Sequence, residues 1–130
     1  MGPAPTQPLV LDAGALIAIE RGRRPVLALL AVAAEADLGV IVPAGVIAQV
    51  WRGGPRQARI ARVIHAADTT VEPLDLLEAE AAGALCGATG TADAIDASVV
   101  ITARRHRALV LTSDPRDIRQ LDPDIDLEVV

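Results

Sequence analysis

Short runs of aliphatic residues alternate along this chain with longer stretches of helical pattern. We expect five strands, in residues 8–12, 39–43, 69–75, 108–114 and 126–130. We expect helices between them, in residues 13–22, 25–36, 44–54, 55–67, 76–90 and 92–106, and a short helical turn at 115–121. Apolar strands that alternate with helices are typical of a parallel sheet covered on both faces. The sequence therefore predicts an α/β fold, a three-layer α/β/α sandwich around a central parallel sheet.

Length and composition favour one compact domain. The chain has 130 residues, enough to bury a core, and since Trp51 is its one aromatic residue, that core must consist of Leu, Ile, Val and Ala. Residues 1–7 are expected to be a flexible leader, followed by a single domain at 8–130. No secretory signal pattern is present, and no apolar run reaches the roughly 18 residues of a membrane span. Together with a lone cysteine, Cys86, this predicts a cytoplasmic protein without a membrane segment.

Acidic side chains follow two of the predicted strands. Asp12 ends the strand LVLD, and Asp114 ends the strand LVLTSD. The carboxyl ends of parallel strands meet at one edge of the sheet, where ligands of such folds bind. An aspartate in this position also commonly caps the next helix. For either residue alone this capping role is an open alternative, whereas the pair indicates a site.

Two further aspartates stand in the segment TADAIDASVV, residues 91–100. Thr91 is expected to cap a helix that begins at Ala92. Because Asp93 and Asp96 are three residues apart, they lie about 60° apart around a helix axis and share a face. Either acid can simply compensate the helix dipole, and Asp93 is the stronger candidate for that lesser role. The helix begins at the edge where the strands end, so both carboxylates can also join the strand-end aspartates.

Four carboxylates at one edge of a sheet need a positive counter-charge. Without one they repel each other, and their pKa values rise. A hard divalent cation with oxygen ligands relieves this repulsion. We therefore predict a Mg²⁺ or Mn²⁺ site, whose metal-binding and catalytic residues are Asp12, Asp93, Asp96 and Asp114.

Two motifs in this order resemble the PIN-domain family: VLDAGALIAI at residues 10–19 and DASVVITARRHRALVLTSD at residues 96–114. The resemblance extends from Leu9 to the C-terminus, and the length is similar to that of VapC-like toxin ribonucleases. It implies a Mg²⁺- or Mn²⁺-dependent endoribonuclease, a hydrolase of RNA phosphodiester bonds. Asp12, Asp96 and Asp114 match the family's acids, and Asp93 matches an additional acid of some members. The resemblance also implies a homodimer neutralised by a VapB-like antitoxin.

One position departs from the family pattern. Gln49 stands where the family usually carries a glutamate, so an acceptor oxygen is kept and a negative charge is lost. The metal is then held less tightly unless Asp93 supplies the missing charge. The alternative function is a catalytically weakened or inactive PIN-like module that binds RNA or protein. Thr112 and Ser113 are possible site-lining residues, although hydroxyls at strand ends also bond to the local backbone.

The basic residues are twelve arginines and no lysine. A net charge of −5 argues against a general nucleic-acid binder, so phosphate contacts must come from local clusters. The first candidates for RNA binding are Arg52, Arg56 and Arg59, and the next are Arg21, Arg23 and Arg24. For any one of them, a solvated helix face is an equally good explanation.

Two other classes of strand-end aspartate protein do not fit. A phosphoacceptor receiver domain needs an acidic pair after the first strand and a lysine late in the sheet, and this chain has one aspartate there and no lysine. A phosphatase of the haloacid dehalogenase type needs Asp-x-Asp after the first strand, where this chain has Asp-Ala-Gly. Both classes are excluded on these residues.

Overall fold

The five strands form a single parallel sheet in the computed structural model, which describes residues 4–130. Their order is β3–β2–β1–β4–β5, and every neighbouring pair is parallel. The strands are β1 (Leu9–Leu11), β2 (Val40–Pro43), β3 (Thr69–Glu72), β4 (Leu109–Thr112) and β5 (Leu127–Val129). Residues 1–3 of the expected leader lie outside the described residues, and Gln7 donates its amide to the carbonyl of Arg107 at 3.0 Å.

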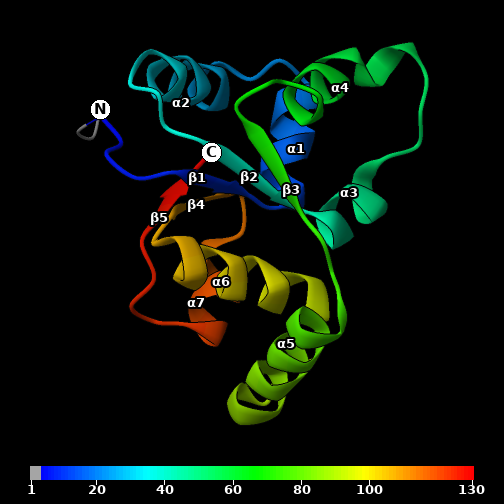
Figure 1. Ribbon diagram of the computed structural model, residues 1–130, viewed down its shortest axis with the longest axis vertical. Coiled ribbons are helices and arrows are strands. Elements are labelled where there is room, and N and C mark those ends of the chain that lie inside the picture. The colour runs from blue at the N-terminus through cyan, green and yellow to red at the C-terminus, as the bar shows by residue number, and fades with distance from the viewer. Residues whose placement is uncertain (1–3) are drawn as a thin grey trace.

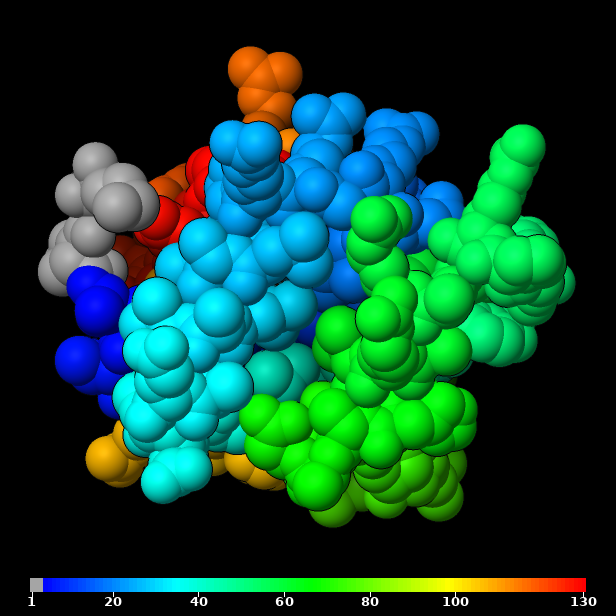
Figure 2. Space-filling view, turned by 90° about the horizontal axis from the view of Figure 1, so that it is seen from above, coloured from blue at the N-terminus to red at the C-terminus, as the bar shows by residue number. Residues whose placement is uncertain are grey.

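Helices cover both faces of this sheet (Figure 1). One face carries α1 (Ala13–Glu20), α2 (Arg24–Glu35) and α4 (Ala58–Ile64), of which α2 and α4 form the outer layer in Figure 2. The other face carries α5 (Leu76–Thr89), α6 (Ala94–His106) and α7 (Pro115–Leu121), while α3 (Ala44–Val50) contacts both α1 and α6. The predicted three-layer α/β/α sandwich is confirmed. No single helix among residues 4–130 is long and apolar enough to cross a membrane, and α5 with α6, at 108° to each other, passes that test when the two are joined.

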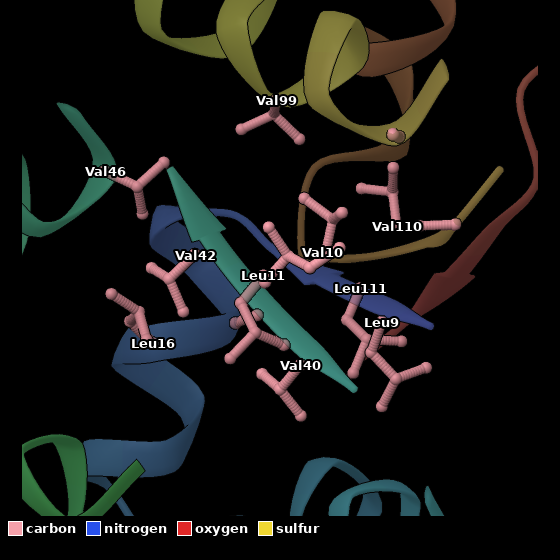
Figure 3. Packing of buried hydrophobic residues seen from close by; sticks show 14 of the residues in the cluster. Leu9, Val10, Leu11, Leu16, Val40, Val42, Val46, Val99, Val110 and Leu111 are labelled. Atoms are coloured by element: carbon pink, nitrogen blue, oxygen red, sulfur yellow. The ribbon is translucent and has the colours of Figure 1, made fainter. Parts of the chain in front are cut away.

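The core consists of aliphatic residues from the central strands and the helices on both faces. Every residue of β1 is fully buried. Its side chains alternate, so that Val10 points toward α6 and Val99 while Leu11 points toward the opposite face, where Leu16 of α1 lies (Figure 3). Trp51 is 41% exposed, so no aromatic ring enters this core, as the composition predicts.

Helix α6 begins two residues later than predicted. Its first residue is Ala94, and its cap is Asp93, whose Oδ1 accepts from the backbone N–H of Asp96 at 2.9 Å. The expectation that Thr91 caps a helix starting at Ala92 is therefore wrong. The physical reason is Gly90, which ends α5 in a left-handed conformation at φ 68° and leaves the next residues as an extended link. The predicted helix at 55–67 is also divided, into a 3-10 turn at Pro55–Gln57 followed by α4.

A buried carboxylate joins α5 to α6. Glu78 of α5 is 2% exposed and forms an ion pair with Arg105 of α6. Its Oε1 also accepts from the hydroxyl of Thr102, at 3.2 Å. Arg105 reaches Glu72 as well, at 2.7 Å, and these two acids raise the pKa of its guanidinium, Glu78 more than Glu72. The network holds α5 against the helix that carries Asp93 and Asp96.

We expect the substitution Arg105→Met to lower the free energy of unfolding by about 1–3 kcal/mol, because it leaves the buried Glu78 without its cation. The matched control is Arg104→Met, which removes a surface pair with Asp122 (2.9 Å) and should cost less than about 1 kcal/mol. Urea unfolding followed by circular dichroism measures both losses. Equal losses in the two variants would contradict a supporting role for the Glu78 network.

Candidate metal and catalytic site

The site lies where β1 and β4 end side by side. In the order β3–β2–β1–β4–β5, the strands that follow β1 in the chain are added first on one side of it, as β2 and β3, and then on the other side, as β4 and β5. The point between β1 and β4 is therefore the topological switch point, where ligands of parallel sheets bind. Asp12 directly follows β1, and Asp114 follows β4 by one residue. Helix α6 begins at the same edge and brings Asp93 and Asp96. The four predicted acids come from three elements that are far apart in sequence.

Asp12 is the most buried acid of the site, at 5% exposed. Its Oδ1 caps α1 by accepting from the N–H of Ala15 at 2.8 Å. Burial raises its pKa above the ordinary value, and the negative charge of Asp114 adds to that rise. Hydrogen bonds from the Thr112 side chain and from the backbone of Ala15 and Gly14 act in the opposite direction. Asp12 therefore acts as a helix cap and remains close enough to Asp114 for repulsion.

Asp96 carries the largest electrostatic strain. Burial, which is the largest cause, and the charges of Asp93, Asp12, Asp117 and Asp114, in that order, together raise its pKa to about 7. Every predicted acid of the site thus lies within electrostatic reach of Asp96. Such a carboxylate is stabilised by any cation that enters the site.

Asp117 belongs to the acidic site, and the sequence reasoning missed it. It lies in the first turn of α7, three residues after Asp114. A hydrogen bond between the two carboxyl groups raises the pKa of Asp117, and the charge of Asp114 adds to the rise. The signal was present in the sequence, since Asp114 and Asp117 repeat the spacing of Asp93 and Asp96.

Three of the acids line a hollow of about 320 Å³ between the start of α6 and α7. They are Asp93, Asp96 and Asp117, and the loop at residues 89–92 forms another wall. Asp93 reaches this hollow although its Oδ1 caps α6, so the capping role and a place among the site acids are compatible. The hollow is the opening through which solvent meets Asp96.

The predicted site-lining residues have different positions. Thr112 is fully buried, and its hydroxyl oxygen accepts from the N–H of Asp114 at 2.9 Å while its side chain bonds to Asp12. It therefore links the two strand-end acids. Ser113 is exposed and lies against Gly14. Gln49 is exposed near the end of α3 and is not part of the lining of the acidic hollow.

The two arginine clusters also differ. Arg52 donates to the carbonyl of Trp51 at 2.8 Å, and Arg59 donates to the carbonyl of Glu20 at 3.2 Å. Arg56 is exposed. The other cluster, at residues 21–24, borders a groove of about 610 Å³ that also contains Gly14 and Ser113. The cluster ranked second from sequence therefore lies on a groove that begins beside the site acids.

The donor set at this edge suits a hard divalent cation. It contains carboxylate and hydroxyl oxygens, and its members raise each other's pKa values. Within residues 4–130, no group of three or more acidic, His or Cys side chains is close enough to hold an ion directly. Mg²⁺ commonly takes one or two carboxylates and keeps several of its waters. The residues fit an ion that is bound in that way.

We expect Asp96→Asn to stabilise the metal-free protein at pH 8 and to have little effect at pH 4.5. The pKa of about 7 in the folded protein lies above the ordinary aspartate value of 3.8, so the native state binds the extra proton between these pH values, and its stability falls as the pH rises through this window. The neutral amide removes the penalty, a gain of about 1–2 kcal/mol after solvent screening. Urea unfolding in a chelator measures it, with Asp124→Asn as the control. A gain of the same size at both pH values would contradict the raised pKa.

Comparison with solved structures finds the same fold in FitAB, VapBC2 and FitAcB. The FitAB complex bound to an IR36 DNA fragment is 18% identical, with a TM-score of 0.63 over 93% of this chain and 94% of that one. VapBC2 from Rickettsia felis, bound to a promoter DNA fragment, is 14% identical, with a TM-score of 0.67 over 94% and 98%. FitAcB from Neisseria gonorrhoeae is 18% identical, with a TM-score of 0.59 over 92% and 95%.

Among curated protein sequences, none matches this chain significantly. The family model for the PIN domain, in contrast, matches residues 9–122, which include all five acids of the site. This match covers most of the chain and agrees with the parallel sheet and with its acidic edge. The chain belongs to the PIN-domain family.

Proposed function

We propose that this protein is a Mg²⁺- or Mn²⁺-dependent endoribonuclease and the toxin of a VapC-like toxin–antitoxin pair. The observation that carries the proposal is the position of Asp96, whose pKa is raised to about 7 by burial and by four other aspartates. Such crowding has a cost in the metal-free protein that a structural role does not explain. Membership of the PIN-domain family supports the same function, since toxins of this family are in general nucleases.

In the proposed mechanism, Asp12, Asp96 and Asp114 would hold the metal, one or two of them directly and the rest through its bound waters, and the free oxygen of Asp93 would assist them. A bound Mg²⁺ or Mn²⁺ supplies Lewis-acid polarisation of the scissile phosphate and a more acidic water. The remaining carboxylate oxygens orient that water by accepting its hydrogen bonds. Thr112 keeps Asp12 and the backbone of Asp114 in register, because it bonds to both.

The alternative is an inactive PIN-like module that binds RNA or protein, and Gln49 is the observation that favours it. Gln49 lacks the charge of the usual glutamate, and its side chain is exposed near the end of α3. Asp117 compensates for the negative charge that is missing at Gln49, because it adds a carboxylate to the acidic hollow. The sequence pattern alone did not reveal this residue. The charge balance therefore favours an active enzyme.

The proposed partners are an RNA substrate and a VapB-like antitoxin, and the proposed location is the cytoplasm. Names of the similar structures support the antitoxin, since they are FitAB and VapBC2 complexes. An antitoxin segment that carries a basic side chain would complement the acidic hollow beside Asp96. That complementarity is electrostatic and matches the need of Asp96 for a positive partner.

We expect the purified protein to cleave single-stranded or structured RNA with Mn²⁺ or Mg²⁺ present and to be inactive in a chelator. Asp96→Asn should lower the rate at least about 100-fold, because it removes a ligand at the centre of the site. The measurement is the cleavage rate of labelled RNA on a denaturing gel, together with Mn²⁺ binding by calorimetry.

The matched control is Asp124→Asn, which makes the same charge change at an exposed position outside the acidic hollow and should leave the rate unchanged. A third variant, Gln49→Glu, should raise Mn²⁺ affinity if the missing charge matters. If the wild-type protein neither cleaves RNA nor binds Mn²⁺, the nuclease proposal is refuted and the inactive module remains.

We also propose a homodimer that buries the apolar surface at the start of α5. Leu76 and Leu77 are 76% and 73% exposed, and Leu74 beside them is 43% exposed. Adjacent exposed leucines are typical of a protein interface. The neighbouring strand β3 is an edge of the sheet, so this side of the molecule has no further element of the sheet to cover it.

Leu76→Glu combined with Leu77→Glu should convert the dimer to a monomer in sedimentation equilibrium, because two charges would be buried at the interface. Ala28→Glu with Ala34→Glu, at two exposed positions of α2, is the control and should remain dimeric. A wild-type protein that is monomeric at micromolar concentration would contradict the dimer, as would a double-leucine variant that stays dimeric.

A further inference from the structure

A groove of about 610 Å³ follows one side of α1. Its lining includes Gly14, Ile17, Ala18 and Arg21, which are three, one and three residues apart and therefore share one face of the helix. With 8 residues, α1 is about 12 Å long. One end of the groove thus lies at Gly14, two residues after Asp12, and the other end lies at the arginines of residues 21–24.

Within residues 4–130, the three arginines at one end of this groove form no ion pair. Arg21, Arg23 and Arg24 are exposed and line the groove, and in the described part of the chain the arginines that form ion pairs are two others, Arg104 and Arg105. The nearest acid along the chain is Glu20. Its Oε1 accepts from the side-chain amide of Gln57 at 2.9 Å, so it is engaged elsewhere. Three cations in a protein of net charge −5 therefore face solvent together.

The other end of the groove is kept open by Gly14. A Cβ at this position would overlap Oγ of Ser113 and lie 3.1 Å from its backbone nitrogen. Ser113 is exposed and lies between Thr112, which is buried, and Asp114, which is exposed. Any side chain at Gly14 would press on the loop that carries Asp114. The glycine thus permits the close approach of α1 to the site loop and leaves the Ser113 hydroxyl in the groove.

We propose that this groove, from Ser113 to Arg24, binds the phosphodiester backbone of single-stranded RNA on one side of the scissile bond. The inference rests on the proposed function and adds the direction in which the substrate leaves the site. Arginine guanidinium groups match phosphate geometry, and they supply the attraction that the acidic edge lacks. The other side chains of the lining, those of Gly14, Ile17, Ala18, Pro25, Ser113 and Val130, carry no charge.

The test measures RNA binding without catalysis. A labelled single-stranded RNA is titrated in a chelator, and binding is followed by fluorescence anisotropy at several salt concentrations. The groove variant is Arg21→Gln with Arg23→Gln and Arg24→Gln, and it should bind at least about tenfold more weakly. Its slope of log affinity against log salt should fall by about 2, as expected for three lost contacts to a single strand. The control, Arg62→Gln with Arg104→Gln and Arg107→Gln, has the same net charge and should bind like the wild type.

The groove and the acidic site can fail separately. In calorimetry, the groove variant should bind Mn²⁺ with the same affinity as the wild type. If the triple variant does not fold, the RNA-binding test is repeated with Arg23→Glu alone, which changes one exposed side chain. A groove variant that binds RNA like the control overturns the inference, even where the wild type cleaves RNA. The inference is also overturned if the groove variant binds a polyglutamate peptide more weakly than the wild type does but binds RNA equally well. In that case the groove binds an acidic protein segment. RNA binding in the groove without any cleavage would instead refute the proposed nuclease.

Discussion

The parallel pairing of β1 with β4 is the constraint on which the site depends. Leu9, Val10 and Leu11 pair in register with Leu109, Val110 and Leu111, and five of these six residues are buried at 0% exposure. Because side chains alternate between the two faces of the sheet, a register shift of one residue would turn each side chain to the opposite face. The register therefore follows from apolar packing against the helices on both faces, and Asp12 and Thr112 are carried to the same edge by it. This apolar packing offsets the free-energy cost of placing the acids together.

That cost is reduced by the helices that begin at this edge. Asp12 is the cap of α1, Asp93 is the cap of α6, and Asp114 precedes α7. Each helix N-terminus presents unpaired N–H groups and a partial positive charge, which stabilise a nearby carboxylate. Asp96 lies in the first turn of α6 but is half-buried and surrounded by the other four acids, and its pKa rises to about 7. This is therefore the position where a metal ion would have the largest effect.

Strands, layers and three of the acids could be predicted from sequence because each depends on a local pattern. An apolar run identifies a buried strand, and an aspartate directly after that strand lies at the carboxyl edge of the parallel sheet. The role of Asp93 was harder to predict, because an aspartate at this position can be a helix cap or a ligand of the site. The start of α6 was also missed, because it depends on Gly90, which ends α5. The role of Glu78 could not be foreseen, because its partner Arg105 is distant in sequence and the other acid of the same helix, Glu80, is exposed. Long-range charge pairing leaves no periodic signal.

Opposite charges meet this edge from the two faces of the sheet. The hollow at Asp93, Asp96 and Asp117 opens between α6 and α7, whereas the arginine groove follows α1 and α2 on the other face. A single patch of mixed charge would pair its arginines with its aspartates and remove both from use. The sheet between the two faces prevents that neutralisation, because β1 and β4 and the side chains packed on them fill the space. Gly14 of α1 lies against Ser113, and there the groove approaches the loop that carries Asp114. A polyanion bound along the groove would reach the acids at this point, where it needs a divalent cation to come closer.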